Sequence, residues 1–309
     1  MSDIIVKTTG LCADFKIKDR MVRAVNRVSL SLERGKTLVI LGESGSGKST
    51  YMKALLRILP KTAAVEGQAE FLGNDLFRMS EKEFRDIRGN RMAMIYQDSL
   101  SALDPMYKVG YQIVETIRAH SSLTKAEARE RMNAYPDEMS GGMRQRAVIA
   151  MALCCNPCLL LADEPTTALD VTIQKQILNL FLELQESDRM SIMMVTHDIG
   201  VAAQVADQIA IMYGGIILEC GATRQVLETP ANPYTKALIA ALPKSGNRER
   251  LVAIEGQPPT IVHMPPGCPF SNRCAYATEA CRQSVPELKP INEHHMTACH
   301  MNLVTSGGK

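Results

Sequence analysis

A glycine-rich stretch between two regular segments has the clearest chemistry. It follows the apolar run 37–41, which predicts a buried strand, and precedes a predicted helix over 51–59. Glycines let successive backbone amides turn toward an anion, and a helix N-terminus adds a positive dipole end. We therefore expect a phosphate-binding loop, in which Lys48 reaches the β- and γ-phosphates and the Ser49 hydroxyl binds Mg²⁺. Within Gly42-Glu43-Ser44-Gly45-Ser46-Gly47-Lys48-Ser49-Thr50, the expected nucleotide-binding residues are Gly42, Ser44, Gly45, Gly47, Lys48, Ser49 and Thr50.

Two acids at the end of another apolar run form a second candidate centre. Leu159-Leu160-Leu161-Ala162 is followed by Asp163 and Glu164, and open α/β sheets bind ligands at the carboxyl ends of such strands. We expect Asp163 to hold Mg²⁺ and Glu164 to orient and deprotonate an attacking water. Gln97 ends a predicted strand and could sense the γ-phosphate and the metal. His197 follows another predicted strand and could bond to a γ-phosphate oxygen. The expected Mg²⁺ ligands are Ser49, Gln97 and Asp163.

Two further elements could contact a nucleotide. A Ser-Gly-Gly turn at a helix start, Ser140-Gly141-Gly142, is a second potential anion site, and the helix is expected over 147–154. Phe15 lies between two predicted strands and could stack on a base, although a lone Phe is more often part of the core.

Regular segments are expected around these motifs. Alternating apolar residues over 1–35 predict antiparallel strands, and the polar stretch 98–150 predicts an inserted helical subdomain. The other predicted elements are strands at 68–72, 91–97 and 192–195, helices at 80–88 and 171–185, and a hairpin of 209–213 with 216–220.

The net charge and the apolar stretches of the chain limit its possible functions. The chain has 309 residues and a net charge of +2, which gives no support to nucleic acid as the main partner. No stretch approaches the 18–20 apolar residues of a membrane span, and the N-terminus has no apolar region typical of secretion. If the protein works at a membrane, other chains must cross it.

Taken in order along residues 1–230, these motifs resemble the ATP-binding cassette ATPases. The resemblance implies an α/β P-loop cassette with a RecA-like core, an antiparallel β subdomain and a helical subdomain at about 98–150. It makes Phe15 the base-stacking aromatic, Gln97 part of the loop facing the membrane partner, and His197 the switch histidine. It also makes Ser140-Gly141-Gly142 the signature motif and Ala168-Leu169-Asp170 the subunit-contact loop. In that family ATP is enclosed between two cassettes, so a second cassette subunit is expected.

The spacing between two of these motifs departs from the family. Ser140 follows Gln97 by only 43 positions (140 − 97), which is shorter than usual in this branch. We expect a trimmed helical subdomain that still closes.

The nine cysteines fall into two groups. Five lie in or beside apolar segments and are expected to be small buried hydrophobes: Cys12, Cys154, Cys155, Cys158 and Cys220. Four lie in the irregular tail at spacings C-x5-C-x6-C-x17-C: Cys268, Cys274, Cys281 and Cys299. Without a secretory signal disulfides explain them poorly, whereas four thiolates could bind zinc or an iron–sulfur cluster. Zinc sites usually have closer cysteines, so the spacing slightly favours a cluster.

The tail also resembles the C-terminal extension of oligopeptide and dipeptide importer ATPases. The matching stretches are Asn232-Pro233-Tyr234-Thr235, Gly256-Gln257-Pro258-Pro259 and Pro266-Gly267-Cys268-Pro269-Phe270 with Arg273-Cys274. The resemblance implies a peripheral subunit at the cytoplasmic face of the cell membrane. There it would hydrolyse ATP to drive peptide import with a sister ATPase, two membrane-spanning subunits and an external peptide-binding protein. It also implies a [4Fe–4S] cluster, with zinc as the alternative, on the four tail cysteines of a small metal-binding extension over 231–309.

Two alternatives come from other classes. One is a soluble cassette ATPase acting on nucleic acid, which the near-neutral charge disfavours. The other is a regulatory subunit that does not hydrolyse ATP; the presence of Glu164 and His197 argues against it, and the short helical segment argues for it.

Overall fold

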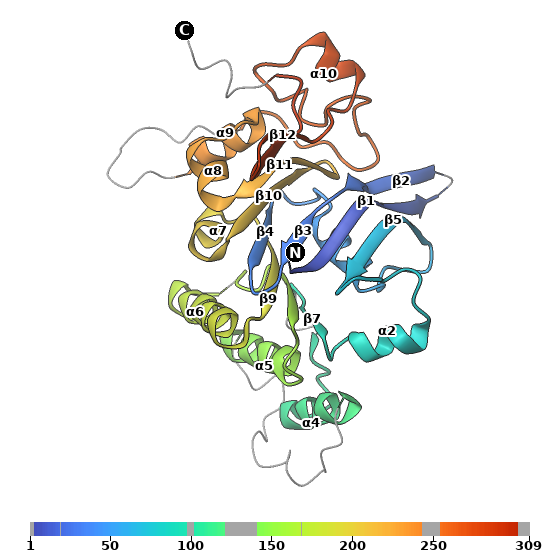
Figure 1. Ribbon diagram of the computed structural model, residues 1–309, viewed down its shortest axis with the longest axis vertical. Helices are drawn as coiled ribbons and strands as arrows, with labels where there is room; N and C mark the ends of the chain where they lie inside the picture. Colours follow the sequence, from blue (N-terminus) through green and yellow to red (C-terminus); the bar gives the residue numbers. More distant parts are fainter. Residues whose placement is uncertain are drawn as a thin grey trace. The chain divides into compact units, whose positions relative to one another are not determined.

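The computed structural model describes residues 3–18, 20–97, 102–120, 141–167, 169–242 and 254–301 (Figure 1). The chain divides into two compact units. The first unit comprises Met1–Lys7, Ser31–Thr37 and Glu70–Val195, and the second comprises Thr8–Leu30, Leu38–Ala69 and Thr196–Lys309. Strands β1 (Ile4–Ile17) and β5 (Ala63–Phe71) contribute residues to both units.

Three parallel strands form the centre of the first unit. β8 (Leu159–Asp163) pairs with β7 (Met92–Ile95) on one side and with β9 (Ser191–Thr196) on the other. All five residues of β8 and all six of β9 are buried, as expected of apolar strands covered on both faces. In the same unit β3 (Ser31–Glu33) pairs with the start of β1, and β6 (Asn74–Asp75) pairs with the end of β5.

Local sequence explains where two of the helices of the first unit begin. These helices are α2 (Glu81–Ile87), α4 (Val109–His120), α5 (Gly141–Leu153) and α6 (Val171–Asp188). Ser80 and Glu83 form a capping box on α2, and the Asp170 side chain accepts a hydrogen bond from the Ile173 amide at the start of α6. Such caps satisfy backbone amides that have no partner inside the helix.

A second set of strands organises the other unit, in the order β4-β10-β11-β13-β12. β4 (Thr37–Leu41) is parallel to β10 (Gln208–Tyr213), and the remaining pairs are antiparallel. The other strands are β11 (Ile216–Ala222), β12 (Lys289–Asn292), β13 (His295–Thr297) and β2 (Arg20–Val28), which pairs with the later part of β1. The helices are α1 (Lys48–Leu55), α7 (Ile199–Val205), α8 (Thr223–Glu228), α9 (Pro233–Ala240) and α10 (Glu279–Gln283).

Most strands predicted from apolar runs are confirmed, including those at 37–41 and 192–195 and the hairpin around Gly214 and Gly215. The tail is more regular than predicted, because β12 and β13 extend the sheet from β11 (Figure 1). These strands have only four and three residues, too few to show an alternating pattern. Their conformation is set by pairing, of β13 with β11 and of β12 with β13. Among the helices described here, none has both the length and the apolar character that a membrane crossing requires.

Of two predictions for the helical segment, one is changed by the structure and the other lies largely outside the described residues. The helix expected over 147–154 begins earlier, since α5 starts at Gly141. The proposed shortening of the helical subdomain falls largely on residues 121–140, which lie outside the described residues.

Candidate nucleotide site and cysteine pocket

The phosphate-loop sequence connects β4 to α1, as predicted. Gly45 and Gly47 have φ values of 77° and 101°, a region that favours glycine. At Gly42 an added Cβ would lie 2.1 Å from the Met212 carbonyl oxygen of β10. Gly42 therefore lets the loop approach the sheet, while Gly45 and Gly47 let it turn back into the helix.

Lys48 is the first residue of α1, and its side chain folds back onto the loop. Its Nζ donates to the carbonyl oxygens of Gly42 (2.7 Å) and Glu43 (2.8 Å), and only 5% of the residue is exposed. Gly47 caps the helix without a side-chain hydrogen bond. A buried ammonium group and the N-terminus of a helix thus lie together in this loop, which is the electrostatic setting that binds phosphate.

The two acids after the β8 apolar run have different surroundings. Asp163 ends the strand and is 2% exposed. Glu164 has a left-handed backbone (φ 48°), and its amide donates to the Val195 carbonyl oxygen at 2.9 Å. Its Oε2 accepts hydrogen bonds from Gln97 Nε2 (3.1 Å) and Thr167 Oγ1 (2.8 Å). Strained backbone of this kind is concentrated at functional sites.

The structure therefore brings Gln97 and Glu164 together within the first unit, although they are 67 positions apart. Gln97 lies two residues beyond the end of β7 rather than within the strand. Thr167 is a contact that the sequence prediction missed; its position three residues after Glu164 is the only signal that could have indicated it.

The signature motif is described in part. Ser140 and Ala168 lie outside the described residues, while Gly141 starts α5. A Cβ on Gly142 would be 3.5 Å from Ile173 Cγ2 of α6, so this glycine faces another helix closely. The buried Gln145 donates from Nε2 to the Pro165 carbonyl oxygen at 2.8 Å. Sequence reasoning missed this link, which ties α5 to the turn that follows Glu164.

The other candidate residues occupy separate places. His197 is exposed and directly follows β9, and Leu169 and Asp170 precede α6. Phe15 on β1 is half-buried and stands opposite Val22 of β2 in the antiparallel register. The nucleotide-related roles of these residues stay predictions.

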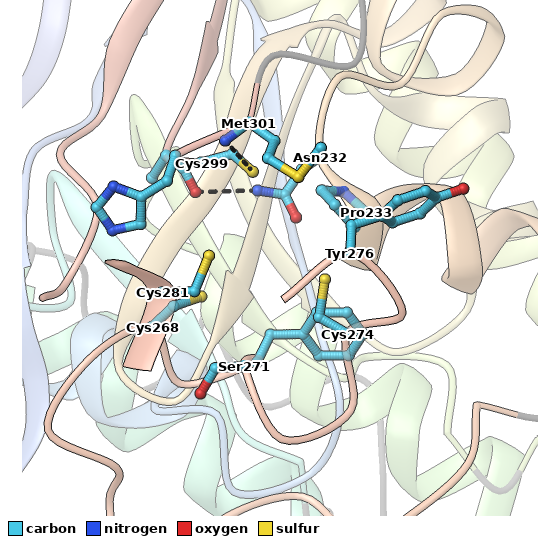
Figure 2. A pocket seen from close by; sticks show the side chains of 12 residues that line it. Asn232, Pro233, Cys268, Ser271, Cys274, Tyr276, Cys281, Cys299 and Met301 are labelled. Carbon is cyan, nitrogen blue, oxygen red and sulfur yellow. Dashed lines mark hydrogen bonds between the residues drawn. The ribbon is translucent and has the colours of Figure 1, made fainter. Parts of the chain in front are cut away.

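All four tail cysteines line one pocket (Figure 2). Cys268, Cys274, Cys281 and Cys299 share it with neighbours that include Asn232 and Phe270. The Cys268 amide donates to the Cys281 carbonyl oxygen at 2.7 Å, which holds two of the cysteines in place. Burial, with smaller contributions from the neighbouring cysteines, raises the pKa of the Cys268 thiol to about 11. Burial also raises the pKa values of Cys274 and Cys299.

The predicted metal-binding extension is not supported by this geometry. Among the described residues, no group of three or more His, Cys, Asp or Glu side chains could hold a metal ion. The physical reason lies in the reach of one ion. Zinc binds thiolates at about 2.3 Å, so its ligands must converge on one point. The four cysteines surround a shared pocket, but their sulfur atoms do not converge on one point.

Two family models match the chain. The model described as ABC transporter matches residues 25–167, and the model described as oligopeptide/dipeptide transporter, C-terminal region, matches residues 218–281. The first match includes the phosphate loop and both acids, and the second includes three of the four pocket cysteines.

Curated relatives are similar over nearly the whole chain. The oligopeptide transport ATP-binding protein OppD of Haemophilus influenzae is 43% identical, and the match covers 96% of this chain and 97% of that protein. The dipeptide transport ATP-binding protein DppD of Escherichia coli is 42% identical, with 98% of each chain covered.

Solved structures show the fold. The post-hydrolysis dimer of the ATP-binding cassette MJ0796 bound to ADP and Pi matches with a TM-score of 0.64 and 28% identity. The match covers 71% of this chain and 99% of that one. The predicted cassette fold is thus confirmed.

Proposed function

This chain belongs to the family of ATP-binding proteins of oligopeptide and dipeptide ABC transporters, and from this premise we propose that it hydrolyses ATP to drive peptide import. One observation carries the proposal: ATP-binding proteins of oligopeptide and dipeptide transport match both the cassette and the C-terminal extension at 42–43% identity. We propose residues 1–230 as the cassette and 231–309 as the extension.

The phosphate loop would hold the triphosphate. Lys48, now bonded to loop carbonyl oxygens, would transfer its hydrogen bonds to the β- and γ-phosphates. The backbone amides after Gly42, with Ser44 and Thr50, would bind the remaining phosphate oxygens. Phe15 would stack on the base. Ser49, Gln97 and Asp163 would hold Mg²⁺, which neutralises charge that develops on the phosphates.

Glu164 would act as the general base. Its carboxylate accepts hydrogen bonds from Gln97 and Thr167, which limits its orientation. It would take a proton as water attacks the γ-phosphorus, and the bond to the β–γ bridging oxygen would break. His197 would stabilise the charge on the γ-phosphate oxygens. Most of the acceleration would come from positioning and charge stabilisation.

The assembly would contain several chains. A second cassette would supply the signature Ser140-Gly141-Gly142 to ATP on this chain, and residues 168–170 would contact it; a heterodimer is proposed. Two membrane-spanning subunits and an external peptide-binding protein would complete the importer. The chain would lie at the cytoplasmic face of the cell membrane as a peripheral subunit.

The four pocket cysteines would hold a [4Fe–4S] cluster. The support is their shared pocket and an all-thiol donor set, which is the set that such clusters use. A cluster keeps its thiolates farther apart than one ion does, and so suits cysteines that do not converge on a point. When bound it would supply a covalent crosslink between segments and a one-electron redox centre.

The central experiment is peptide-stimulated ATP hydrolysis by the complete importer in proteoliposomes. We expect hydrolysis and uptake to require peptide with its binding protein, and Glu164→Gln to abolish both while ATP still binds. A rate of ATP hydrolysis that depends on neither the membrane subunits nor peptide would overturn the proposal.

A separate measurement tests the cluster. An anaerobic absorption spectrum of the purified chain, with iron and sulfide analysis, should show about four of each per chain. Stoichiometric zinc without iron would refute the cluster.

A further inference from the structure

Arg273 of the C-terminal extension makes a partly buried contact with the phosphate loop. Its Nη1 donates to both carboxylate oxygens of Glu43, at 3.0 and 2.9 Å, and to the Tyr213 hydroxyl at 3.0 Å. Only 6% of the Arg273 side chain is exposed. Glu43 is the second residue of the loop and lies 230 positions away in sequence. This geometry differs from an exposed ion pair, which contributes little.

The guanidinium is also fixed from its other side. Arg273 Nε donates to the Glu255 carbonyl oxygen at 3.0 Å, and Nη2 donates to that of Ile254 at 3.3 Å. The guanidinium carbon lies 6.0 Å from the centre of the Phe270 ring. Because all three guanidinium nitrogens are engaged, the group that reaches Glu43 is held in place before any nucleotide binds.

Aromatic residues support the same contact. Tyr213, Tyr234 and Phe270 pack together with ring centres 4.5 to 5.4 Å apart. The Tyr234 hydroxyl accepts a hydrogen bond from the Glu43 amide at 3.3 Å. The Glu43 carbonyl oxygen accepts from Lys48. The amide, the carbonyl and the carboxylate of Glu43 are therefore all engaged, two of them by groups that lie outside the loop.

A second connection reaches the loop through the hairpin turn between β10 and β11. A Cβ on Gly214 would lie 2.5 Å from Pro269 Cβ, so the extension packs directly against this turn. The next residue, Gly215, donates from its amide to the Ser46 carbonyl oxygen at 3.0 Å. The extension thus reaches the loop directly at Glu43 and, through this turn, at Ser46.

The charge of Glu43 gives this contact a consequence for ligand binding. A carboxylate on a loop that binds a triphosphate repels the ligand unless a cation compensates it. We propose that Arg273 is a positioning residue for the phosphate loop: it neutralises Glu43 and fixes the loop, so that nucleotide affinity depends on the extension. This inference rests on the proposed ATP binding. Arg273 directly precedes Cys274, so one short segment both contacts the loop and lines the cysteine pocket.

The test is titration of the full chain with a fluorescent ATP analogue and Mg²⁺. Arg273→Gln should raise the Kd roughly 2- to 150-fold, the range for groups in one hydrogen-bond network, and should raise KM more than it lowers kcat. Glu43→Gln combined with Arg273→Gln should recover most of the affinity, because no uncompensated charge remains. Arg282→Gln is the matched control, since Arg282 lies in the extension with an exposed pairing to Glu279.

Two results would overturn the inference. One is an unchanged Kd in Arg273→Gln. The other is a loss that the double variant does not relieve, because the arginine would then only help the extension to fold. If Arg273→Gln does not fold, Arg273→Lys serves in the same comparison. A wild-type chain that does not bind the analogue would instead refute the proposed function.

Discussion

Glu219 offers a sharp test of how the extension is attached to the sheet. Its side chain on β11 is fully buried, and its two oxygens accept three hydrogen bonds. The donors are His295 Nε2 at 2.6 Å, the Ala231 amide at 2.8 Å and the Asn232 amide at 3.1 Å. His295 belongs to β13, so one carboxylate ties β11 both to the residues before α9 and to the tail strand. Replacing Glu219 by alanine should release both.

The expected loss of stability follows from the hydrogen-bond donors that the substitution leaves without an acceptor. Glu219→Ala strands three buried donors, and each unsatisfied donor costs about 1–3 kcal/mol. Water entering the space left by the side chain would keep each cost near the lower end. The total is then about 3–5 kcal/mol, which matches the cost of removing one member of a buried pair. Glu219→Gln keeps an acceptor oxygen of similar size and should cost about half as much.

Amide hydrogen exchange measures this loss of stability at the individual amides that Glu219 holds. The amides of Ala231 and Asn232 should exchange on the order of a hundredfold faster in Glu219→Ala, since every 1.4 kcal/mol is a factor of ten. The thermal unfolding midpoint should be lowered in both variants, and more in Glu219→Ala than in Glu219→Gln. Wild-type exchange rates at these two amides in Glu219→Ala would refute the reasoning, because the carboxylate would then not hold them.

Three further predictions concern the two candidate sites. Glu164→Gln should reduce ATP turnover by at least a hundredfold with little change in nucleotide affinity; retained turnover, measured by phosphate release, would contradict its role as base. Gly47→Ala should abolish nucleotide binding, because the φ of 101° is strained for alanine and its Cβ would lie 2.4 Å from the Ala24 carbonyl oxygen; wild-type affinity would count against the loop geometry. The raised pKa of Cys268, from 9.0 to about 11, favours the folded chain below pH 9, and this stabilisation is lost as the pH rises toward 11. Unfolding midpoints of the metal-free protein should therefore fall over this range, and less so in Cys268→Ser.

Contiguous motifs made half of the candidate site predictable. The phosphate loop carries its glycines, lysine and helix start within nine consecutive residues, and β8 carries its acids directly after an apolar run. Backbone geometry at such places follows from neighbouring residues alone. The cysteine spacing indicated a shared site, but it did not show that β13 leads Cys299 to the pocket.

The contacts that were missed join residues far apart in sequence. Gln145 bonds to Pro165 across 20 positions, Glu219 to His295 across 76, and Arg273 to Glu43 across 230. Each involves an ordinary polar residue with no distinguishing pattern around it. The pairing of β11 with β13 and the packing of the tail on the β10–β11 turn bring the last two of these pairs together.

The buried polar contacts of the extension explain more about geometry than about stability. Well-packed apolar side chains could often give equal stability in place of a buried ion pair. What they could not give is direction, because the fork of Arg273 fits the Glu43 carboxylate, the Tyr213 hydroxyl and two carbonyl oxygens in one arrangement only. A shift of Cys274 would therefore move the neighbouring guanidinium and strain its contact with Glu43. The Glu43 carbonyl oxygen also accepts a hydrogen bond from Lys48. The same shift would therefore displace the lysine that we expect to bind phosphate. The cysteine pocket and the nucleotide loop are thus joined through two consecutive residues, Arg273 and Cys274.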